Sequence, residues 1–245
     1  MEKLLIKNIA QLLIVLPLII YTLKKSHIKW SALLLFCLFF LQNQLLLELP
    51  REFEFLNIIE GNWNWSGKIY AMAGSLLFYW LFKKEFSEHD FFKIKQARNS
   101  IRPNIITTLI VMFLAVALAF FLFGKSEPDT ETLLFQLTMP GFDEEIAFRG
   151  IMLGLLSTVL NETIDFGFIK FGNPAILITS ILFGLIHSFG IDEQWHIAQD
   201  WIYFSQTFLY GLVLGWMTIK SRSILMPIIS HNLTNTVGTI ITWIK

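Results

Sequence analysis

Long apolar runs follow one another along almost the whole chain, and short polar connections separate them. Because a helix needs about 20 apolar residues to cross the hydrocarbon core of a bilayer, each run is a candidate membrane span. Backbone groups in hydrocarbon must be hydrogen-bonded internally, and no alternation typical of barrel strands is present, so we expect helices throughout. The predicted spans cover residues 4–23, 30–49, 66–82, 105–123, 142–160, 173–190, 201–219 and 224–243.

This pattern predicts an all-α fold, a polytopic transmembrane helical bundle of about eight spans. No polar stretch is long enough for a separate soluble domain, so we expect one integrated membrane domain. Residues 1–126 hold the first four spans with a cytoplasmic loop at 83–104, and residues 127–245 hold the last four. The first run contains Lys7 and Pro17 and lacks a small-residue cleavage site, so we expect it to be retained as a span.

The connections alternate in charge. Lysine and arginine concentrate on the cytoplasmic side of membrane proteins, so the basic connections predict that side and place both termini outside the cytoplasm. This topology describes an integral, multi-pass protein, located in the cell membrane if the source is prokaryotic. The basic connections carry Lys24, Lys25, Lys29, Lys83, Lys84, Lys93, Lys95, Arg98, Arg102, Lys220 and Arg222. The acidic connections carry Glu48, Glu52, Glu54, Glu60, Glu127, Asp129, Glu131, Asp192, Glu193 and Asp200.

The composition supports a membrane protein, since 54% of the 245 residues are apolar and 16% are charged. The 19 basic and 19 acidic residues balance to a net charge of zero, so nothing favours a nucleic-acid partner. The expected partners are the lipid bilayer and a membrane-associated protein or peptide. Cys37 is the single cysteine, and its place in an apolar run is typical of a packing residue.

Three predicted spans in the second half carry charged or strongly polar side chains. A charge at the centre of a spanning helix costs roughly 2.5 to 3.5 kcal/mol, so such residues are paired, hydrated or used chemically. At about 1.5 Å per helical residue from the cytoplasmic ends of their spans, they reach a similar depth and are expected to converge. They are Glu144, Glu145 and Arg149 in the fifth span, His187 in the sixth, and His231, Asn232 and Asn235 in the eighth.

Helical spacing places these residues on different faces of their helices. Glu145 and Arg149 are four residues apart, so they share one face and are expected to form an ion pair. Glu144 points about 100° around the helix and is left for another partner. Pro140 and Gly141 favour a helix start immediately before Glu144, where free backbone amides stabilise a carboxylate.

Four ordered motifs resemble those of the CPBP family. They are Glu-Glu-Ile-Ala-Phe-Arg-Gly at 144–150, Phe-Gly-Leu-Ile-His at 183–187, Phe-Leu-Tyr-Gly-Leu-Val-Leu-Gly at 208–215 and His-Asn-Leu-Thr-Asn at 231–235. That family groups the type II CAAX prenyl endopeptidases with the bacterial Abi and bacteriocin-processing-type intramembrane proteases. The resemblance covers about 140–236, whereas the first four spans match only in being spans.

The resemblance implies an intramembrane endopeptidase that hydrolyses a peptide bond of a membrane-associated protein or peptide. Under it, Glu144 and His187 bind and activate the attacking water. His231 and Asn235 stabilise the oxyanion of the tetrahedral intermediate. Glu145 and Arg149 support the site.

Metal use stays open at this point, since Glu144, His187 and His231 are residue types that bind zinc. We favour a glutamic-type mechanism without a cofactor, because no His-Glu-x-x-His run is present and asparagine suits hydrogen bonding better than zinc. A non-catalytic membrane immunity or regulatory partner is the main alternative function, and a proton-coupled transporter is another. The substrate is open among a prenylated CAAX tail, a secreted peptide precursor and a membrane-anchored sorting tail.

Overall fold

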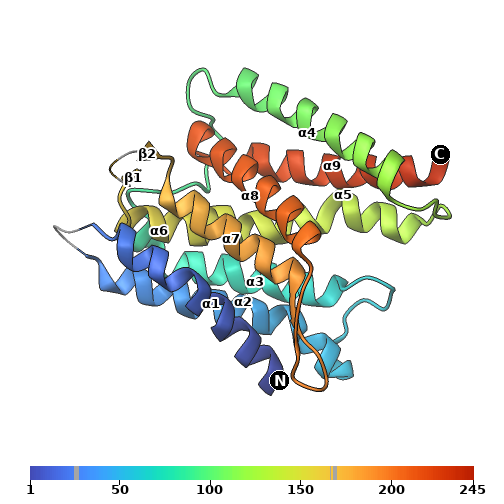
Figure 1. Ribbon diagram of the computed structural model, residues 1–245, viewed down its shortest axis with the longest axis horizontal. Coiled ribbons are helices and arrows are strands. Elements are labelled where there is room, and N and C mark those ends of the chain that lie inside the picture. The colour runs from blue at the N-terminus through green and yellow to red at the C-terminus, as the bar shows by residue number, and fades with distance from the viewer. Residues whose placement is uncertain (25–27, 166, 168–169) are drawn as a thin grey trace.

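The computed structural model describes residues 1–24, 28–165, 167 and 170–245, so Lys25 of the first basic connection lies outside the described residues. Within this part of the chain, nine α-helices form one bundle, with most of the connecting loops at its two ends (Figure 1). The helices are α1 (Glu2–Thr22), α2 (Trp30–Glu52), α3 (Trp65–Leu81), α4 (Ile101–Leu122), α5 (Thr130–Glu145), α6 (Leu153–Val159), α7 (Pro174–Ser188), α8 (Trp201–Ser221) and α9 (Leu225–Ile244).

Short elements complete the fold. Two 3-10 turns, η1 (Glu54–Leu56) and η2 (Lys83–Phe86), follow α2 and α3, and a π-helix, η3 (Ile146–Met152), lies between α5 and α6. Antiparallel hairpins pair β1 (Ile164–Asp165) with β2 (Lys170–Phe171) and β3 (Phe189–Ile191) with β4 (Ile197–Gln199). These hairpins lie in connections outside the helical bundle, so the all-α fold class is confirmed. The predicted loop at 83–104 is shorter than expected, since η2 opens it and α4 begins at Ile101.

Every predicted span corresponds to helix, but the count of eight spans is not confirmed. Within the described residues, four helices are long and apolar enough to cross a membrane, namely α1, α2, α4 and α8. The helices α3 and α7 have 17 and 15 residues, fewer than the about 20 that a full crossing needs. These four candidates indicate an integral membrane protein.

The fifth predicted span begins earlier than expected. Helix continues from Thr130 through α5, η3 and α6 to Val159, so Pro140 and Gly141 lie inside it and the predicted helix start before Glu144 is wrong. The start lies at Asp129, whose carboxylate accepts hydrogen bonds from the amides of Glu131 and Thr132. Pro140 is tolerated because the amide of Gly141 donates instead to the Asn232 side chain of α9, at 2.7 Å.

The π-helix follows directly after the glutamate pair. The amide of Leu153 donates to the carbonyl of Phe148, five residues earlier, which is the π pattern. All seven residues of this segment are buried, and Arg149 is 1% exposed. Such π segments are frequent at functional sites, since they re-aim side chains within a continuous helix.

The two halves of the chain pack together. Helix α1 contacts α7, α2 contacts α6, and α3 contacts α5, while α5 also packs on α9 and α7 on α8. One apolar core joins both halves, with Phe36, Phe39 and Phe40 of α2 buried together with Phe148 and Phe183. The first three helices therefore line one side of the interior in which Glu144 and Glu145 lie.

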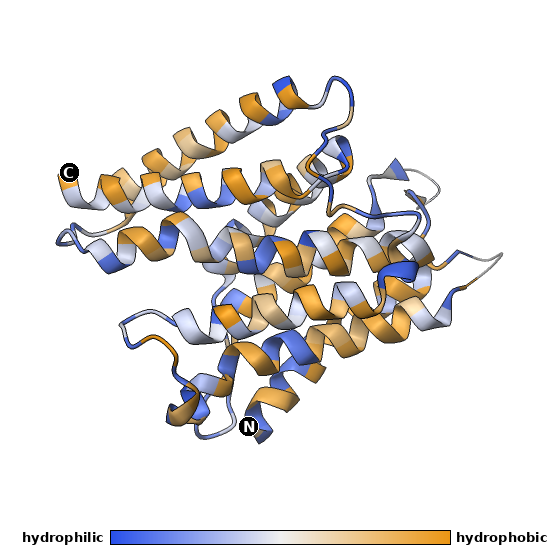
Figure 2. Cartoon of the chain, turned by 180° about the vertical axis from the view of Figure 1, so that it is seen from behind, coloured by the Kyte–Doolittle hydropathy of each residue, from blue (hydrophilic) through white to orange (hydrophobic). Residues whose placement is uncertain are grey.

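The outer surface of the bundle is apolar. Helix α4 exposes Leu109, Phe113 and Phe121, the last two at 71% and 78%. In Figure 2, apolar residues cover most of the helices, while polar residues gather in the loops at the two ends and at a few positions between helices. A surface of this kind suits lipid tails, in agreement with a membrane location.

Candidate active site

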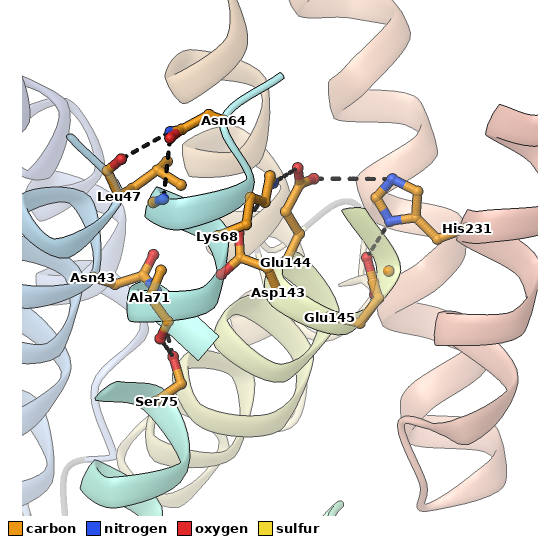
Figure 3. Close-up of polar contacts among 12 residues, drawn as sticks. Asn43, Leu47, Asn64, Lys68, Ala71, Ser75, Asp143, Glu144, Glu145 and His231 are labelled. Carbon is orange, nitrogen blue, oxygen red and sulfur yellow. Dashed lines mark hydrogen bonds and ion pairs between the residues drawn. The ribbon is translucent and has the colours of Figure 1, made fainter. Parts of the chain in front are cut away.

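Glu144 meets two histidines from two other helices. Its Oε2 atom lies 3.7 Å from Nε2 of His187 in α7 and 3.9 Å from Nε2 of His231 in α9. Figure 3 shows Glu144 and His231 facing each other from the two elements. The structure therefore brings together three of the four residues to which the sequence assigned catalytic roles.

The hydrogen bond of His187 indicates which ring nitrogen carries the proton. Its Nδ1 lies 2.7 Å from the carbonyl of Phe183, one turn earlier in α7. A carbonyl only accepts, so Nδ1 donates, and in the neutral ring the lone pair lies on Nε2. That lone pair and Oε2 of Glu144 face one space from two sides.

His231 is supported by a chain of buried charges. Its Nδ1 lies 2.8 Å from Oε1 of Glu145, and Oε2 of Glu145 lies 3.2 Å from Nε of Arg149. Arg149 donates to the carbonyl of Gly211 at 3.3 Å, and its guanidinium lies 4.4 Å from the centre of the Phe183 ring. The expected Glu145 to Arg149 ion pair is present, and it orients a histidine as well as offsetting two buried charges.

Asn235 lies apart from this group in its contacts. Its amide donates to Oε1 of Gln136 in α5 at 3.0 Å, and no contact joins it to Glu144 or to either histidine among the described residues. Asn232, which carried no predicted role in the reaction, is buried and fixes the Gly141 amide. The His-Asn-Leu-Thr-Asn motif thus fixes α9 against α5 through both asparagines.

Lys68 is a member of the site that the sequence reasoning missed. Its Nζ lies 2.6 Å from Oε1 of Glu144 and 3.0 Å from Oδ2 of Asp143, with the lysine side chain 11% exposed (Figure 3). The signal that could have found it is the one that marked Glu144. An ammonium inside the predicted span 66–82 carries the same cost and asks for a partner.

A polar cavity of about 210 Å³ adjoins these side chains. Its lining includes Lys68, Glu144 and His187 together with the buried amide side chains of Asn43 and Gln44. Arg51 lines this cavity and also a larger hollow of about 520 Å³ formed by the α2–α3 connection. The second hollow lacks ionisable groups of the Glu144 site, so the smaller cavity is the one that bears on its chemistry.

The zinc alternative asks Glu144, His187 and His231 to share a metal ion. In the described part of the chain, no group of three or more histidine, cysteine, aspartate and glutamate side chains is arranged to hold one. The Lys68 ammonium already lies on Oε1 of Glu144, where it supplies the positive charge that a metal would bring. In this arrangement Lys68 occupies Oε1 of Glu144, and only Oε2 faces the two histidines.

Comparison with known proteins places the likeness in the second half of the chain. Residues 127–237 match the family model described as type II CAAX prenyl endopeptidase Rce1-like. An uncharacterized 24.3 kDa protein of Escherichia coli is 33% identical over 115 residues, which are 46% of this chain and 46% of that protein. The chain thus spans about half the length of the curated relative it matches, and no solved structure matches it.

The matched segment contains Glu144, His187, His231 and Asn235, and it ends two residues after the last motif. Lys68 and the α1 to α3 wall of the cavity lie outside it. Residues 127–237 are therefore similar to the Rce1-like type II CAAX prenyl endopeptidases, and we refer to this segment as the Rce1-like domain.

Proposed function

We propose that this protein is an intramembrane endopeptidase that hydrolyses a peptide bond of a membrane-associated protein or peptide. The observation that carries the proposal is the convergence of Glu144 Oε2 with Nε2 of His187 and of His231 beside a polar cavity. The Rce1-like domain supports the reaction class, since its family description is that of a CAAX-type protease.

We assign the activation of the attacking water to Glu144 and His187. A carboxylate oxygen and an unprotonated ring nitrogen 3.7 Å apart both accept, so one water molecule can donate to both. As the water attacks the scissile carbonyl, its proton passes to this pair and then to the leaving amine. General base catalysis of this kind contributes roughly 100-fold to 10,000-fold to a rate.

We assign the stabilisation of the oxyanion to His231 and Asn235. Because Nδ1 of His231 faces the Glu145 carboxylate, the ring donates from Nε2 toward the oxyanion when it carries both protons. One N–H of the Asn235 amide donates to Gln136, and its second N–H is left to donate to the oxyanion. Arg149 supports His231 by holding Glu145 in place. We propose that no metal or other cofactor takes part, with Lys68 rather than zinc as the cation at Glu144.

The substrate reaches the site from within the bilayer or from its surface. The CAAX-type family makes a prenylated tail one candidate, alongside a secreted peptide precursor and a membrane-anchored sorting tail. We propose a multi-pass arrangement with both termini outside the cytoplasm. The cavity is then reached from the end of the bundle that holds the α2–α3 connection, through Arg51.

The test compares membrane and secreted proteomes of cells that express wild type, Glu144→Ala or His187→Ala. We expect a precursor to accumulate with both variants while each variant stays folded in the membrane. His196→Ala is the matched control, because His196 lies in the β3–β4 hairpin with its side chain 79% exposed. Wild-type processing by both site variants would overturn the proposal and favour the non-catalytic partner. Substrate-dependent proton flux in liposomes would favour the transporter.

A further inference from the structure

One charge of the site comes from the half of the chain outside the Rce1-like domain. Lys68 lies in the first turn of α3, and its Nζ contacts Oε1 of Glu144 and Oδ2 of Asp143. Glu144 and Asp143 are adjacent in α5, so a single ammonium faces two neighbouring carboxylates. Among the described residues, no other lysine or arginine contacts either of them.

The first turn of α3 is fixed in a way that aims Lys68 at α5. Asn64 caps the helix by accepting from the amide of Gly67, and its own amide donates to the carbonyl of Leu47 in α2 (Figure 3). Gly67 packs so closely on Leu47 that an added Cβ would lie 2.1 Å from that carbonyl oxygen. The turn is therefore fixed to α2, and Lys68 projects into the space between α3 and α5.

The two oxygens of Glu144 have different surroundings as a result. Oε1 receives the Lys68 ammonium, whereas Oε2 is buried, has no hydrogen-bond partner in the described residues and faces both histidines. A cation on one oxygen favours the ionised carboxylate and fixes the rotation of the side chain. Both properties are those that a base needs when water binds to its other oxygen.

We propose that Lys68 is a positioning residue of this site, which holds Glu144 ionised and turns Oε2 toward His187. The inference rests on the proposed function for its consequence, because an ionised Glu144 matters only if Glu144 takes a proton from water. It also makes the site composite, since the Rce1-like domain holds the motifs and α3 supplies the ammonium.

The ionisation of Glu144 can be tested without a substrate. Lys68→Gln combined with Asp143→Asn removes one positive and one negative charge, so the net charge of the cluster is unchanged. Infrared spectra of this protein in lipid at pH 7 are expected to show the carbonyl band of a protonated carboxyl group. Adding Glu144→Gln must remove that band, and wild type and Asp143→Asn alone must lack it.

Two further variants test whether the band reflects the loss of the Lys68 charge or misfolding. Lys68→Met with Asp143→Leu replaces the ion pair by apolar side chains, an exchange that buried pairs often tolerate, and it is expected to show the same band. Lys68→Arg keeps the positive charge and is expected to lack the band. Absence of the band from either folded double variant would overturn the inference.

A second test uses as substrate the precursor that accumulates with Glu144→Ala. Its processing separates this inference from the proposed function. We expect the Lys68→Gln, Asp143→Asn protein to process it at least about 100-fold more slowly than Asp143→Asn alone, with Lys68→Arg restoring most of the rate. Full-rate processing by the double variant would refute the role of Lys68 and leave the endopeptidase intact. If Glu144→Ala accumulates no precursor, the proposed function fails, and the infrared spectra still decide whether Lys68 holds Glu144 ionised.

Discussion

The backbone amide of Gly141 donates to Oδ1 of Asn232 at 2.7 Å, and this bond carries α5 past Pro140 to the glutamates. Proline in a helix interior removes one backbone hydrogen bond and crowds the preceding turn, so the helix needs support from outside. Asn232 gives that support from α9, the helix that also holds His231. The position of Glu144 relative to His231 thus depends on a contact three residues before Glu144 and one residue after His231.

Gly141→Ala is expected to disturb this contact. An added Cβ would lie 2.5 Å from Oδ1 of Asn232 and 2.7 Å from the carbonyl of Ile228, so α5 and α9 must separate. We expect a loss of about 1 to 3 kcal/mol in the free energy of unfolding, measured by thermal denaturation in detergent. Gly238→Ala in α9 is the control, because a Cβ there meets nothing within 4 Å. It is expected to stabilise the protein by up to about 1 kcal/mol, and an equal loss from both variants would contradict the explanation.

Arg149→Met is expected to be strongly destabilising. It leaves the Glu145 carboxylate, which is 0% exposed, without its cation, and breaking a buried pair in this way typically costs about 3 to 5 kcal/mol. Adding Glu145→Gln removes the uncompensated charge and is expected to recover part of the loss in the same denaturation measurement. A double variant less stable than Arg149→Met would show that Glu145 does not depend on Arg149.

The α2–α3 connection is expected to loosen in acid. Glu131, in the exposed first turn of α5, accepts from the amides of Asn62 and Trp63, and these bonds hold its pKa below the ordinary value. A lowered pKa means that this stabilisation is present above the pKa of the unfolded chain and is lost as pH falls through the folded pKa. The protection factors for hydrogen exchange at the Asn62 and Trp63 amides should therefore fall below about pH 4.5. In Glu131→Gln this pH-dependent fall should be absent.

The orientation in the membrane can be read from cysteine labelling. Cys37 is the single cysteine, so Cys37→Ser gives a clean background for Glu60→Cys and Lys95→Cys, both at exposed positions. We expect an impermeant maleimide to label position 60 on intact cells and position 95 only after permeabilisation. The reverse result would invert the topology and place the entrance near Arg51 in the cytoplasm.

Local spacing predicted some of this architecture and missed parts that depend on tertiary contacts. The Glu145 to Arg149 pair follows from helical geometry alone, and the structure has it. The start expected at Pro140 was wrong because a side chain distant in sequence, Asn232, satisfies the amide that the proline leaves unsupported. Lys68 was not predicted because it lies outside the family motifs, in the first half of the chain, although the cost of a buried ammonium marks it as clearly as a buried carboxylate marks Glu144.

In the π-helix at Ile146–Met152, the number of residues is itself a structural feature. A π segment holds one residue more than regular α-helix over the same turns, so deleting a residue within it converts the segment to ordinary helix. The residues on either side of the segment then keep their orientation, because both forms of the helix cover the same turns. Such a deletion changes the positions of side chains within the segment, including Arg149, and leaves α6 in place. A one-residue deletion in α5, which is regular α-helix, would instead turn everything beyond it by about 100°.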